Sequence, residues 1–141
     1  MSLKVEKVPV WTVGIEDRPG ATVEKLKVLA KSGVNLRFAF ARRQPDQPGT
    51  GVLFVTPIKG KKQEESALAA GFSVSDDIVG VMVEGGDKPG MGGRLLEVLA
   101  EAGINLRGFS AISLGTKFKA FIAFDNSMDA DQGADELKKI K

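Results

Sequence analysis

The hydrophobic positions of the chain form two long, mostly apolar runs, VPVWTVGIE at residues 8–16 and DIVGVMVE at residues 77–84. Apolar runs of this length that are rich in β-branched residues are typical of buried strands. After each run the apolar spacing becomes helical. In the second half of the chain, the residues that line one face of such a helix are Leu95, Val98, Leu99 and Ala102. The pattern therefore predicts a strand followed by an amphipathic helix in each half of the chain.

Two more strands and a second helix are predicted after each of these helices. Gly33 and Gly103 end the first helices, because glycine tolerates the left-handed conformation of a C-terminal cap. The further predicted elements are strands 35–41, 51–56 and 72–74 with helix 60–70 in the first half, and strands 105–113 and 118–124 with helix 129–140 in the second. This βαββαβ order predicts an α+β, ferredoxin-like unit, with an antiparallel sheet and both helices on one face.

The two halves of the chain are copies of one another. An offset of 70 residues places residues 17–37 over residues 87–107, and eleven of 21 positions are then identical. We therefore interpret the chain as a tandem duplication, with a first unit at residues 1–75 and a second at residues 76–141. The second unit lacks a last strand of its own, whereas residues 2–8 occupy the matching phase of the repeat. We hypothesise that this N-terminal segment completes the sheet of the second unit.

The composition favours a binding protein over an enzyme. The 141 residues include no cysteine, histidine or tyrosine. Cysteine metal sites and disulfides are therefore excluded, and the commonest general base near neutral pH is absent. We expect no cofactor and no metal. The net charge is only +2, and no apolar stretch approaches the roughly 18 residues of a membrane span, so we expect a cytoplasmic protein that binds neither nucleic acid nor membrane.

A short motif occurs at the predicted strand-to-helix turn of both repeats. It reads Asp, any residue, Pro-Gly, and it is followed by an apolar helix and by Gly-(Val/Ile)-Asn-Leu at the opening of the next strand. Together with the element order and the duplication, the motif resembles that of the ACT domain, a small-ligand regulatory module. The resemblance covers nearly the whole chain and implies a free-standing tandem ACT-domain protein. It further implies that the protein binds an amino acid and transmits this binding to a regulated enzyme or to an oligomer.

The residues of the motif suit the binding of a carboxylate. Asp17 and Asp87 are expected to cap the first amides of the helices, and Pro19 and Pro89 to pre-set an early helical φ. The glycine that follows has no Cβ, so a ligand can approach the free amides at the positive end of the helix dipole. An α-amino acid supplies such a carboxylate. A purely structural role stays an alternative, because many helices that bind nothing begin with these residues.

The resemblance also implies a contribution from the start of the second strand, commonly from the neighbouring domain, where the ammonium group of the ligand needs an acceptor. Asn35 and Asn105 equally suit turns that bond their own backbone. The candidate ligand-binding residues are Asp87, Lys88, Pro89, Gly90, Met91, Gly92, Asn105 and Leu106 in the second repeat, and Asp17, Arg18, Pro19, Gly20, Ala21, Asn35 and Leu36 in the first. We therefore expect ligand sites at the seams between units, and we expect the chain to form a homodimer.

The repeats differ inside this loop, where MGG at residues 91–93 replaces ATV at residues 21–23. Gly92 and Gly93 weaken the first helical turn but open room beside the backbone, whereas Val23 makes the matching position crowded and stiff. We therefore expect the primary site in the second repeat. The alternative is that the two glycines only relieve a close contact between the repeats.

Two other functions are compatible with the element order. An RNA-binding module would use Phe38 and Phe40, which share a strand face among arginines, but the fragment RGF at residues 107–109 matches only the start of the recognition motif and lies on the wrong strand. A small ferredoxin-like phosphatase would grip phosphate with Arg37 or Arg107 beside an asparagine, but the loop motif of acylphosphatases is missing. The sequence favours a non-enzymatic amino-acid sensor over both.

Overall fold

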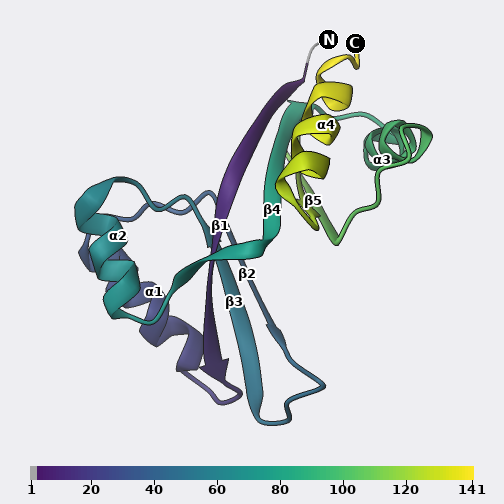
Figure 1. The fold of residues 1–141 in the computed structure, drawn as a ribbon. Coiled ribbons are helices and arrows are strands. Elements are labelled where there is room, and N and C mark those ends of the chain that lie inside the picture. The colour runs from purple at the N-terminus through teal and green to yellow at the C-terminus, as the bar shows by residue number, and fades with distance from the viewer. Residues whose placement is uncertain (1–2) are drawn as a thin grey trace. The chain divides into compact units, whose positions relative to one another are not determined.

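The structure, a computed structural model, describes residues 3–141, without the side chains of residues 76 and 77. It is shown in Figure 1, and its elements are β1 (Lys4–Glu16), α1 (Ala21–Lys31), β2 (Phe38–Arg43), β3 (Thr50–Thr56), α2 (Gly60–Ala69), β4 (Ser73–Gly86), α3 (Met91–Glu101), β5 (Gly108–Leu114), β6 (Lys117–Phe124) and α4 (Ser127–Lys138). The chain divides into two compact units. We call Pro9–Ser75 the first-repeat unit, and Met1–Val8 together with Asp76–Lys141 the second-repeat unit.

In the first-repeat unit, the strands are antiparallel and neighbour one another in the order β2-β3-β1. The register places Val13 opposite Leu53, and Phe40 opposite Phe54. Helices α1 and α2 lie on the same side of these strands (Figure 1). The buried core between helices and strands comprises Trp11, Val13, Leu29, Leu53, Val55, Ile58, Ala67 and Phe72. Removing these apolar side chains from water is the main force that holds the unit together.

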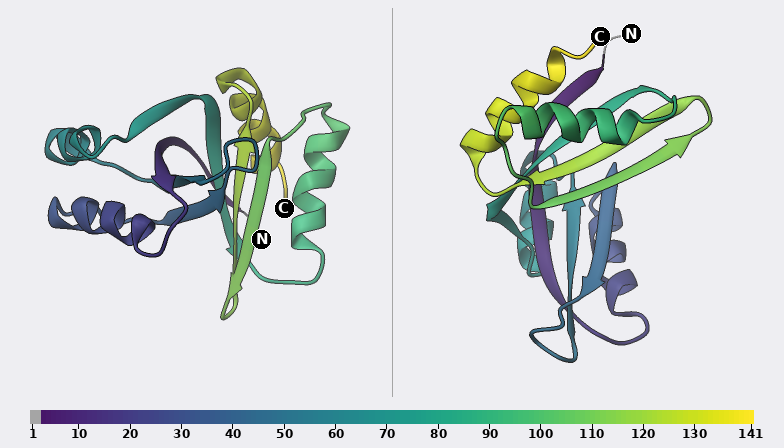
Figure 2. Two further views of the ribbon diagram at one scale, coloured as in Figure 1. Left: turned by 90° about the horizontal axis from the view of Figure 1, so that it is seen from below. Right: turned by 90° about the vertical axis from the view of Figure 1, so that its right-hand side faces the viewer.

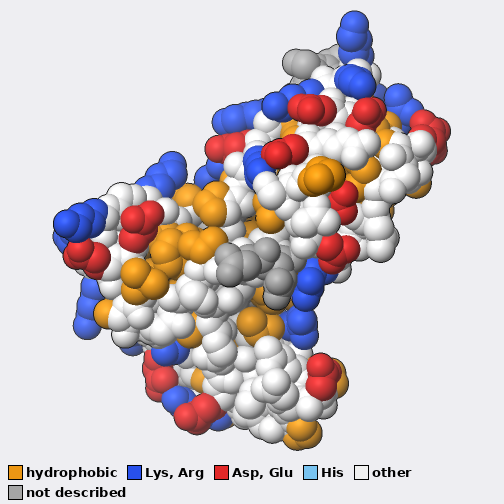
Figure 3. All heavy atoms as spheres, in the orientation of Figure 1, with side chains coloured by type: hydrophobic (Ala, Val, Ile, Leu, Met, Phe, Trp, Pro, Cys, Tyr) orange, Lys and Arg blue, Asp and Glu red, His pale blue; other side chains and the backbone are white. Residues whose placement is uncertain are grey.

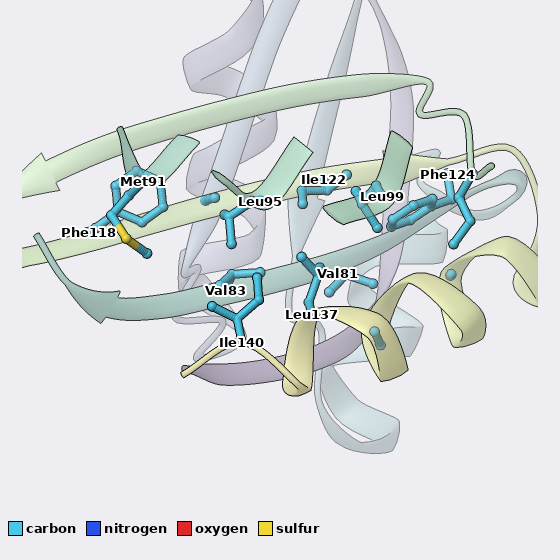
Figure 4. Close-up of a cluster of buried hydrophobic side chains, with 14 residues drawn as sticks. Val81, Val83, Met91, Leu95, Leu99, Phe118, Ile122, Phe124, Leu137 and Ile140 are labelled. Atoms are coloured by element: carbon cyan, nitrogen blue, oxygen red, sulfur yellow. The ribbon is translucent and has the colours of Figure 1, made fainter. Parts of the chain in front are cut away.

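In the second-repeat unit, the strand order is β1-β4-β6-β5, and the register places Val81 opposite Ile122. Helices α3 and α4 lie on one side of these strands (Figure 2). Figure 4 shows how side chains from both helices point toward the sheet, and the labelled members of this core are Val81, Val83, Met91, Leu95, Leu99, Phe118, Ile122, Phe124, Leu137 and Ile140. The observed architecture is the α+β, ferredoxin-like duplication that the sequence predicts.

The N-terminal segment belongs to the second-repeat unit, as hypothesised. Leu3 and Val5 pack against the core of that unit. Lys7 Nζ lies 2.7 Å from the carboxylate of Asp131 in α4 and donates to Ser127 Oγ at 2.7 Å. Because β1 neighbours β4 in the sheet, the segment completes the sheet of the second repeat. The hypothesis started at residue 2, which lies outside the described residues.

The structure corrects several predicted boundaries. β4 runs without a break over Ser73–Gly86, so the prediction of separate strands at 72–74 and 77–84 is wrong. No glycine or proline stands at residues 75 and 76 to interrupt the chain. β2 and β5 start at Phe38 and Gly108, three residues after the predicted starts at 35 and 105, because the preceding residues still belong to the turn that ends the helix.

The helix ends follow local sequence rules. Gly33 has φ 86° and Gly103 has φ 74°, and they follow the ends of α1 and α3 as predicted. The next amide in the first repeat, that of Val34, donates back to Leu29 O at 3.1 Å, which satisfies a carbonyl at the helix end.

Within the described residues, no helix combines the length and the apolar character that crossing a membrane would require.

Candidate ligand site at the second-repeat loop

Both motif loops turn from strand to helix through a glycine in the left-handed region of backbone space. Gly20 has φ 87° and Gly90 has φ 86°, and each is the N-cap residue of the helix that follows. Other residues rarely adopt this conformation. The glycine is therefore required by the backbone itself, in addition to any space that it leaves for a ligand.

The motif forms a type II turn, which corrects the predicted role of the prolines. Ala21 N–H donates to Arg18 O at 3.3 Å, and Met91 N–H donates to Lys88 O at 3.4 Å. Proline and then a glycine with positive φ are the residues preferred at the two central positions of such a turn. Pro19 therefore precedes the N-cap glycine, as its counterpart in the second repeat does, instead of occupying the first helical position.

The aspartates of the motif do not cap the helices, which also corrects the prediction. Within the described residues, neither carboxylate accepts a hydrogen bond from a helix amide, because the glycine of the turn occupies the N-cap position. The backbone amides of Asp17 and Asp87 instead donate to Gly49 O at 3.0 Å and Thr116 O at 2.9 Å. The carboxylate of Asp17 accepts a hydrogen bond from Arg43 Nε at 2.9 Å. The aspartates thus tie the loop to the neighbouring hairpin.

A pocket of about 500 Å³ lies beside the loop of the second repeat, and we call it the second-repeat pocket. It is formed by the loop, by the first turns of α3 and by the two ends of the chain. Its lining residues are Leu3, Gly86, Lys88, Pro89, Gly90, Met91, Gly93, Arg94, Glu97, Ile140 and Lys141. All of them belong to the second-repeat unit. Four of the predicted site residues, from Lys88 to Met91, are therefore brought together around one cavity.

The glycines that are particular to the second repeat have different roles. A Cβ on Gly85 would come within 2.5 Å of the Leu3 side chain, so this glycine makes room for the N-terminal segment. A Cβ on Gly92 would lie 3.5 Å from the ring of Phe109 in β5, in the same unit. Gly92 does not line the pocket, whereas Gly93 does, and a Cβ there would meet no atom within 4 Å.

Charged side chains surround the second-repeat pocket. Lys88, Arg94 and Lys141 contribute positive charge, and Glu97 contributes the one carboxylate among the lining side chains. Arg94 Nη1 lies 3.9 Å from Glu97 Oε1, and both side chains are more than half exposed. Such an exposed pair contributes little to stability. Within the described part of the chain, Lys88 forms no ion pair, so its positive charge is available to a ligand.

In the matching loop of the first repeat, the cation Arg18 forms ion pairs with carboxylates of the same repeat. Arg18 Nε donates to Glu16 Oε2, and Arg18 Nη2 donates to Glu24 Oε2, both at 2.8 Å. The hydrogen bonds to Glu24 and then Glu16 raise the pKa of Arg18 above its usual value, and the hydrogen bond from Arg18 lowers the pKa of Glu24. The cation of this loop is therefore already neutralised within the repeat.

The first-repeat loop also borders a hollow, but with other residues. The hollow measures about 440 Å³ and is lined by Ile15, Glu16, Asp17, Arg18, Thr22, Ala41, Arg42, Arg43 and Gly51. The predicted residues Pro19, Gly20 and Ala21 are not among them. Ala21 is instead buried in the unit, with 4% of its surface exposed. The two loops are thus unequal as binding surfaces.

The asparagine-leucine pairs lie away from the second-repeat pocket. Asn105 and Leu106 fall in the connection between α3 and β5 and do not line the cavity. Leu106 packs against the core of its unit, and Leu36 does the same in the first repeat. The asparagine at position 35 is exposed, as is its counterpart. A ligand role for these four residues stays a prediction.

The residues that would serve RNA or phosphate binding show other contacts. Phe38 and Phe40 stack with their ring centroids 6.5 Å apart, and Arg42 lies 5.9 Å from the ring centroid of Phe54 on the neighbouring strand. Arg107 Nη1 lies 3.7 Å from Asp125 Oδ1. Figure 3 shows one face of the molecule, on which basic and acidic side chains are interspersed. Among the described residues, no group of acidic side chains is arranged to hold a metal ion.

Solved structures share this arrangement over nearly the whole chain. Protein BT0572 from Bacteroides thetaiotaomicron is similar with a TM-score of 0.75 at 16% identity, over 96% of this chain and 99% of that chain. The ligand-free regulatory subunit of aspartate kinase from Thermus thermophilus has a TM-score of 0.65 at 14% identity, over 97% and 95%. The aspartokinase α and β subunits reach 0.64 at 17% identity, over 99% and 96%.

These likenesses concern the fold. No family model and no curated protein matches the chain. The structures nevertheless show that the chain has the fold of the regulatory subunit of aspartate kinase, so the fold implied by the motif is confirmed.

Several residues of the pocket were not expected from the sequence. Arg94 and Glu97 lie one helical turn apart on α3, and Leu3 and Ile140 come from the opposite ends of the chain. The repeat alignment contains a signal for the first two. With the offset of 70, Arg94 stands over Glu24 and Glu97 stands over Lys27, so both charges are reversed between the repeats. No local motif points to the two terminal residues.

Proposed function

We propose that this protein is a regulatory protein that binds an amino acid in the second-repeat pocket. The observation that carries the proposal is the cavity of about 500 Å³ beside the loop in which the sequence predicts the primary site. Pockets that hold small molecules typically measure about 300–1,000 Å³. The fold shared with regulatory subunits of aspartate kinase supports a regulatory role without catalysis.

The lining of the pocket has separate features for each part of an amino acid. The first amides of α3 have no side-chain cap, and Lys88 adds positive charge, so both favour the ligand carboxylate. Glu97 is the acceptor for the ammonium group. Leu3 and Ile140 offer apolar surface to the carbon chain of the ligand. This assignment replaces the asparagine-leucine pair with an acceptor on α3.

Binding is transmitted through segments that are far apart in the sequence. A ligand in the pocket contacts the N-terminal segment at Leu3, the loop, and the end of the chain at Ile140. It therefore favours the conformation in which these three segments lie together. β1 continues from the N-terminal segment into the first-repeat unit, so a change at Leu3 reaches that unit along the chain. The output in this proposal is a regulated enzyme or the assembly of a homodimer in the cytoplasm.

The pocket lies within one unit, whereas the resemblance to ACT domains implies sites at the seams between units. The two kinds of site do not exclude one another. A seam site that includes Asn35, Leu36, Asn105 and Leu106 stays a prediction.

A thermal-shift screen against the twenty amino acids tests the proposal, with RNA and acetyl phosphate as controls for the two other functions. A ligand that binds only the folded state raises the free energy of unfolding, by about 2.7 kcal/mol at a hundred times its Kd. We expect one amino acid, or one chemical class of them, to raise the melting temperature. Stabilisation by RNA alone, or turnover of acetyl phosphate, would contradict the proposal.

The substitution Gly93→Val locates the site. A Cβ at this position meets no atom within 4 Å, and valine is the residue that the first repeat has at the matching position. The variant should fold and gain a few tenths of a kcal/mol of helix propensity, roughly the difference between glycine and valine. Its side chain should fill part of the pocket and lower the affinity by about tenfold or more, as measured by calorimetric titration.

Val23→Gly is the matched control, because it makes the reverse change at the matching position of α1. It should lower stability slightly and leave the affinity unchanged. Unchanged affinity in Gly93→Val, or a loss of affinity in Val23→Gly, would place the site elsewhere.

A further inference from the structure

The charged side chains of the second-repeat pocket differ in whether they form ion pairs. Lys88 has no ion-pair partner in the described part of the chain, whereas Arg94 and Glu97 form a loose pair at 3.9 Å. The side chains of that pair are 53% and 63% exposed, so water already screens their attraction. A ligand can therefore replace each partner of the pair with little loss of interaction free energy. The pocket then offers three cations, namely Lys88, Arg94 and Lys141, and one carboxylate.

A dicarboxylic α-amino acid has charges complementary to those of Lys88, Arg94 and Glu97, namely two carboxylates and one ammonium group. We propose that the ligand of the second-repeat pocket is an acidic amino acid, which rests on the proposed function of the same pocket. Its α-carboxylate lies at the loop beside Lys88, its ammonium group at Glu97, and its side-chain carboxylate at Arg94. All three charges of the ligand and all three of these protein charges then have a partner.

Amino acids of other charge leave this set incomplete. A neutral amino acid leaves Arg94 without a partner after the pair between Arg94 and Glu97 is broken. A basic amino acid adds a positive charge next to Lys88 and Arg94, and like charges in an interface oppose binding. Lys141 adds a further positive side chain to the lining. The charge balance therefore favours the acidic class over the other two.

The first repeat provides an internal comparison for this assignment. Its loop cation, Arg18, is held by two carboxylates at 2.8 Å each. The residues at the positions of Arg94 and Glu97 are Glu24 and Lys27, so the charges are reversed. An acidic ligand in the hollow of the first repeat would meet the carboxylates of Glu16 and Asp17. We therefore expect a single acidic site in each chain, in the second repeat.

Isothermal titration calorimetry on the full chain tests the assignment. The ligands are aspartate and glutamate, their amides asparagine and glutamine, lysine, and succinate, which lacks the ammonium group. We expect aspartate or glutamate to bind about tenfold or more tightly than the corresponding amide, because a hydrogen bond between charged groups is lost in the amide. Lysine should bind more weakly than either amide. Binding should weaken as the salt concentration rises, because the pocket is partly exposed.

Two variants assign the charges individually. Arg94→Gln should abolish the preference for the acid over its amide, while the binding of the amide is retained. Glu97→Gln should abolish the preference for aspartate over succinate. Lys27→Gln, at the position of Glu97 in the first repeat, is the matched control and should change neither preference.

The outcomes separate this inference from the proposed function. Tight binding of a neutral or basic amino acid that is lost in Gly93→Val would overturn the acidic assignment and leave the proposed function intact. An acid preference that survives Arg94→Gln would also overturn it. If none of the twenty amino acids binds, both the inference and the proposed function are wrong.

Discussion

The two motif loops of this protein have the same backbone conformation and differ in their charges. Gly20 and Gly90 have φ values of 87° and 86°, and each loop is tied to its neighbouring hairpin by the amide of the motif aspartate. Around this common backbone, the first repeat places Glu16 and Glu24 against Arg18, whereas the second has Gly86 and Arg94 at the matching positions. The duplication has therefore preserved the turn, while the loop cation is paired with carboxylates in the first repeat and has no ion-pair partner among the described residues in the second.

The second helices of the two repeats show a similar contrast in packing. In α4, a Cβ on Gly133 would lie 2.8 Å from the ring of Phe124, which leaves no room for a side chain. The matching residue of α2 is Gln63, whose side chain donates to Gly33 O at 3.0 Å and accepts from Lys59 N–H at 2.8 Å. The same position is thus a point of close helix approach in one unit and a surface hydrogen-bonding residue in the other.

Exchanging these two residues should have the largest effect on stability. Gly133→Gln forces a side chain against the Phe124 ring, and such overpacking costs about 1–3 kcal/mol, to which burial of the amide group adds about 1–3 kcal/mol. Gln63→Gly should cost less, about 1 kcal/mol of helix propensity and roughly 0.5–1 kcal/mol for each of the two exposed hydrogen bonds that it removes. Urea unfolding monitored by circular dichroism measures both values. Equal losses in the two variants would show that the packing of the two units is the same.

Replacing the turn glycines should have a smaller effect that is equal in the two repeats. Gly20→Ala and Gly90→Ala each place a Cβ in the left-handed backbone region, which costs about 1–2 kcal/mol. Because neither Cβ would meet another atom within 3.4 Å, the loss reflects the backbone alone. Chemical denaturation of the two variants should therefore give matching values. A clear difference between the two losses of stability would mean that the two loops do not form the same type of turn.

The pH dependence of the first loop should be the smallest effect. The hydrogen bond from Arg18 lowers the pKa of the Glu24 carboxyl below its usual range. A carboxylate with a lowered pKa in the folded state contributes stability above its unfolded pKa, and this contribution is lost as the pH falls through the folded pKa. Glu24→Gln should therefore be slightly less stable than the parent protein at pH 7, and the difference should vanish at a pH well below 4.5.

Glu64→Gln controls for the removal of a carboxylate as such, because this residue is exposed and forms no ion pair in the described part of the chain. The urea midpoints of the three proteins are compared at neutral and at acidic pH. A difference between parent and Glu24→Gln that persists unchanged at low pH would show that the Arg18 clamp does not depend on the charge of Glu24.

The fold was largely predictable, because two independent signals agreed. The strand and helix periods predicted each element, and the duplication allowed each repeat to check the other. The assignment of the N-terminal segment to the second repeat followed from its phase in the repeat, and the packing of Leu3 and Val5 confirms it. The continuous strands β1 and β4 were missed as single elements. Each strand continues across the change of unit at Val8 and Ser75, although Pro9 and Asp76, which follow directly, are residue types that favour turns.

The candidate site was predictable only in part. The loop itself was found, since proline and glycine in sequence mark a turn. Its geometry was misjudged, because Asp-x-Pro-Gly suits both a capped helix and a type II turn, and only the φ of the glycine distinguishes them. Arg94 and Glu97 were overlooked because a charge on an exposed helix face is usually only solvated. Leu3 and Ile140 reach the pocket through tertiary packing, which no local pattern records.

A nitrogen-15 correlation NMR titration of the full chain with aspartate tests the central claim most directly. The second-repeat pocket predicts saturable shifts of the backbone amides of Lys88, Gly90, Met91 and Arg94, with the amides of residues 18–24 unchanged. In Gly93→Val the same shifts should require about tenfold or more aspartate. Shifts confined to the first-repeat loop, or shifts in the second-repeat loop that Gly93→Val shows at the same aspartate concentrations as the parent protein, would contradict the account.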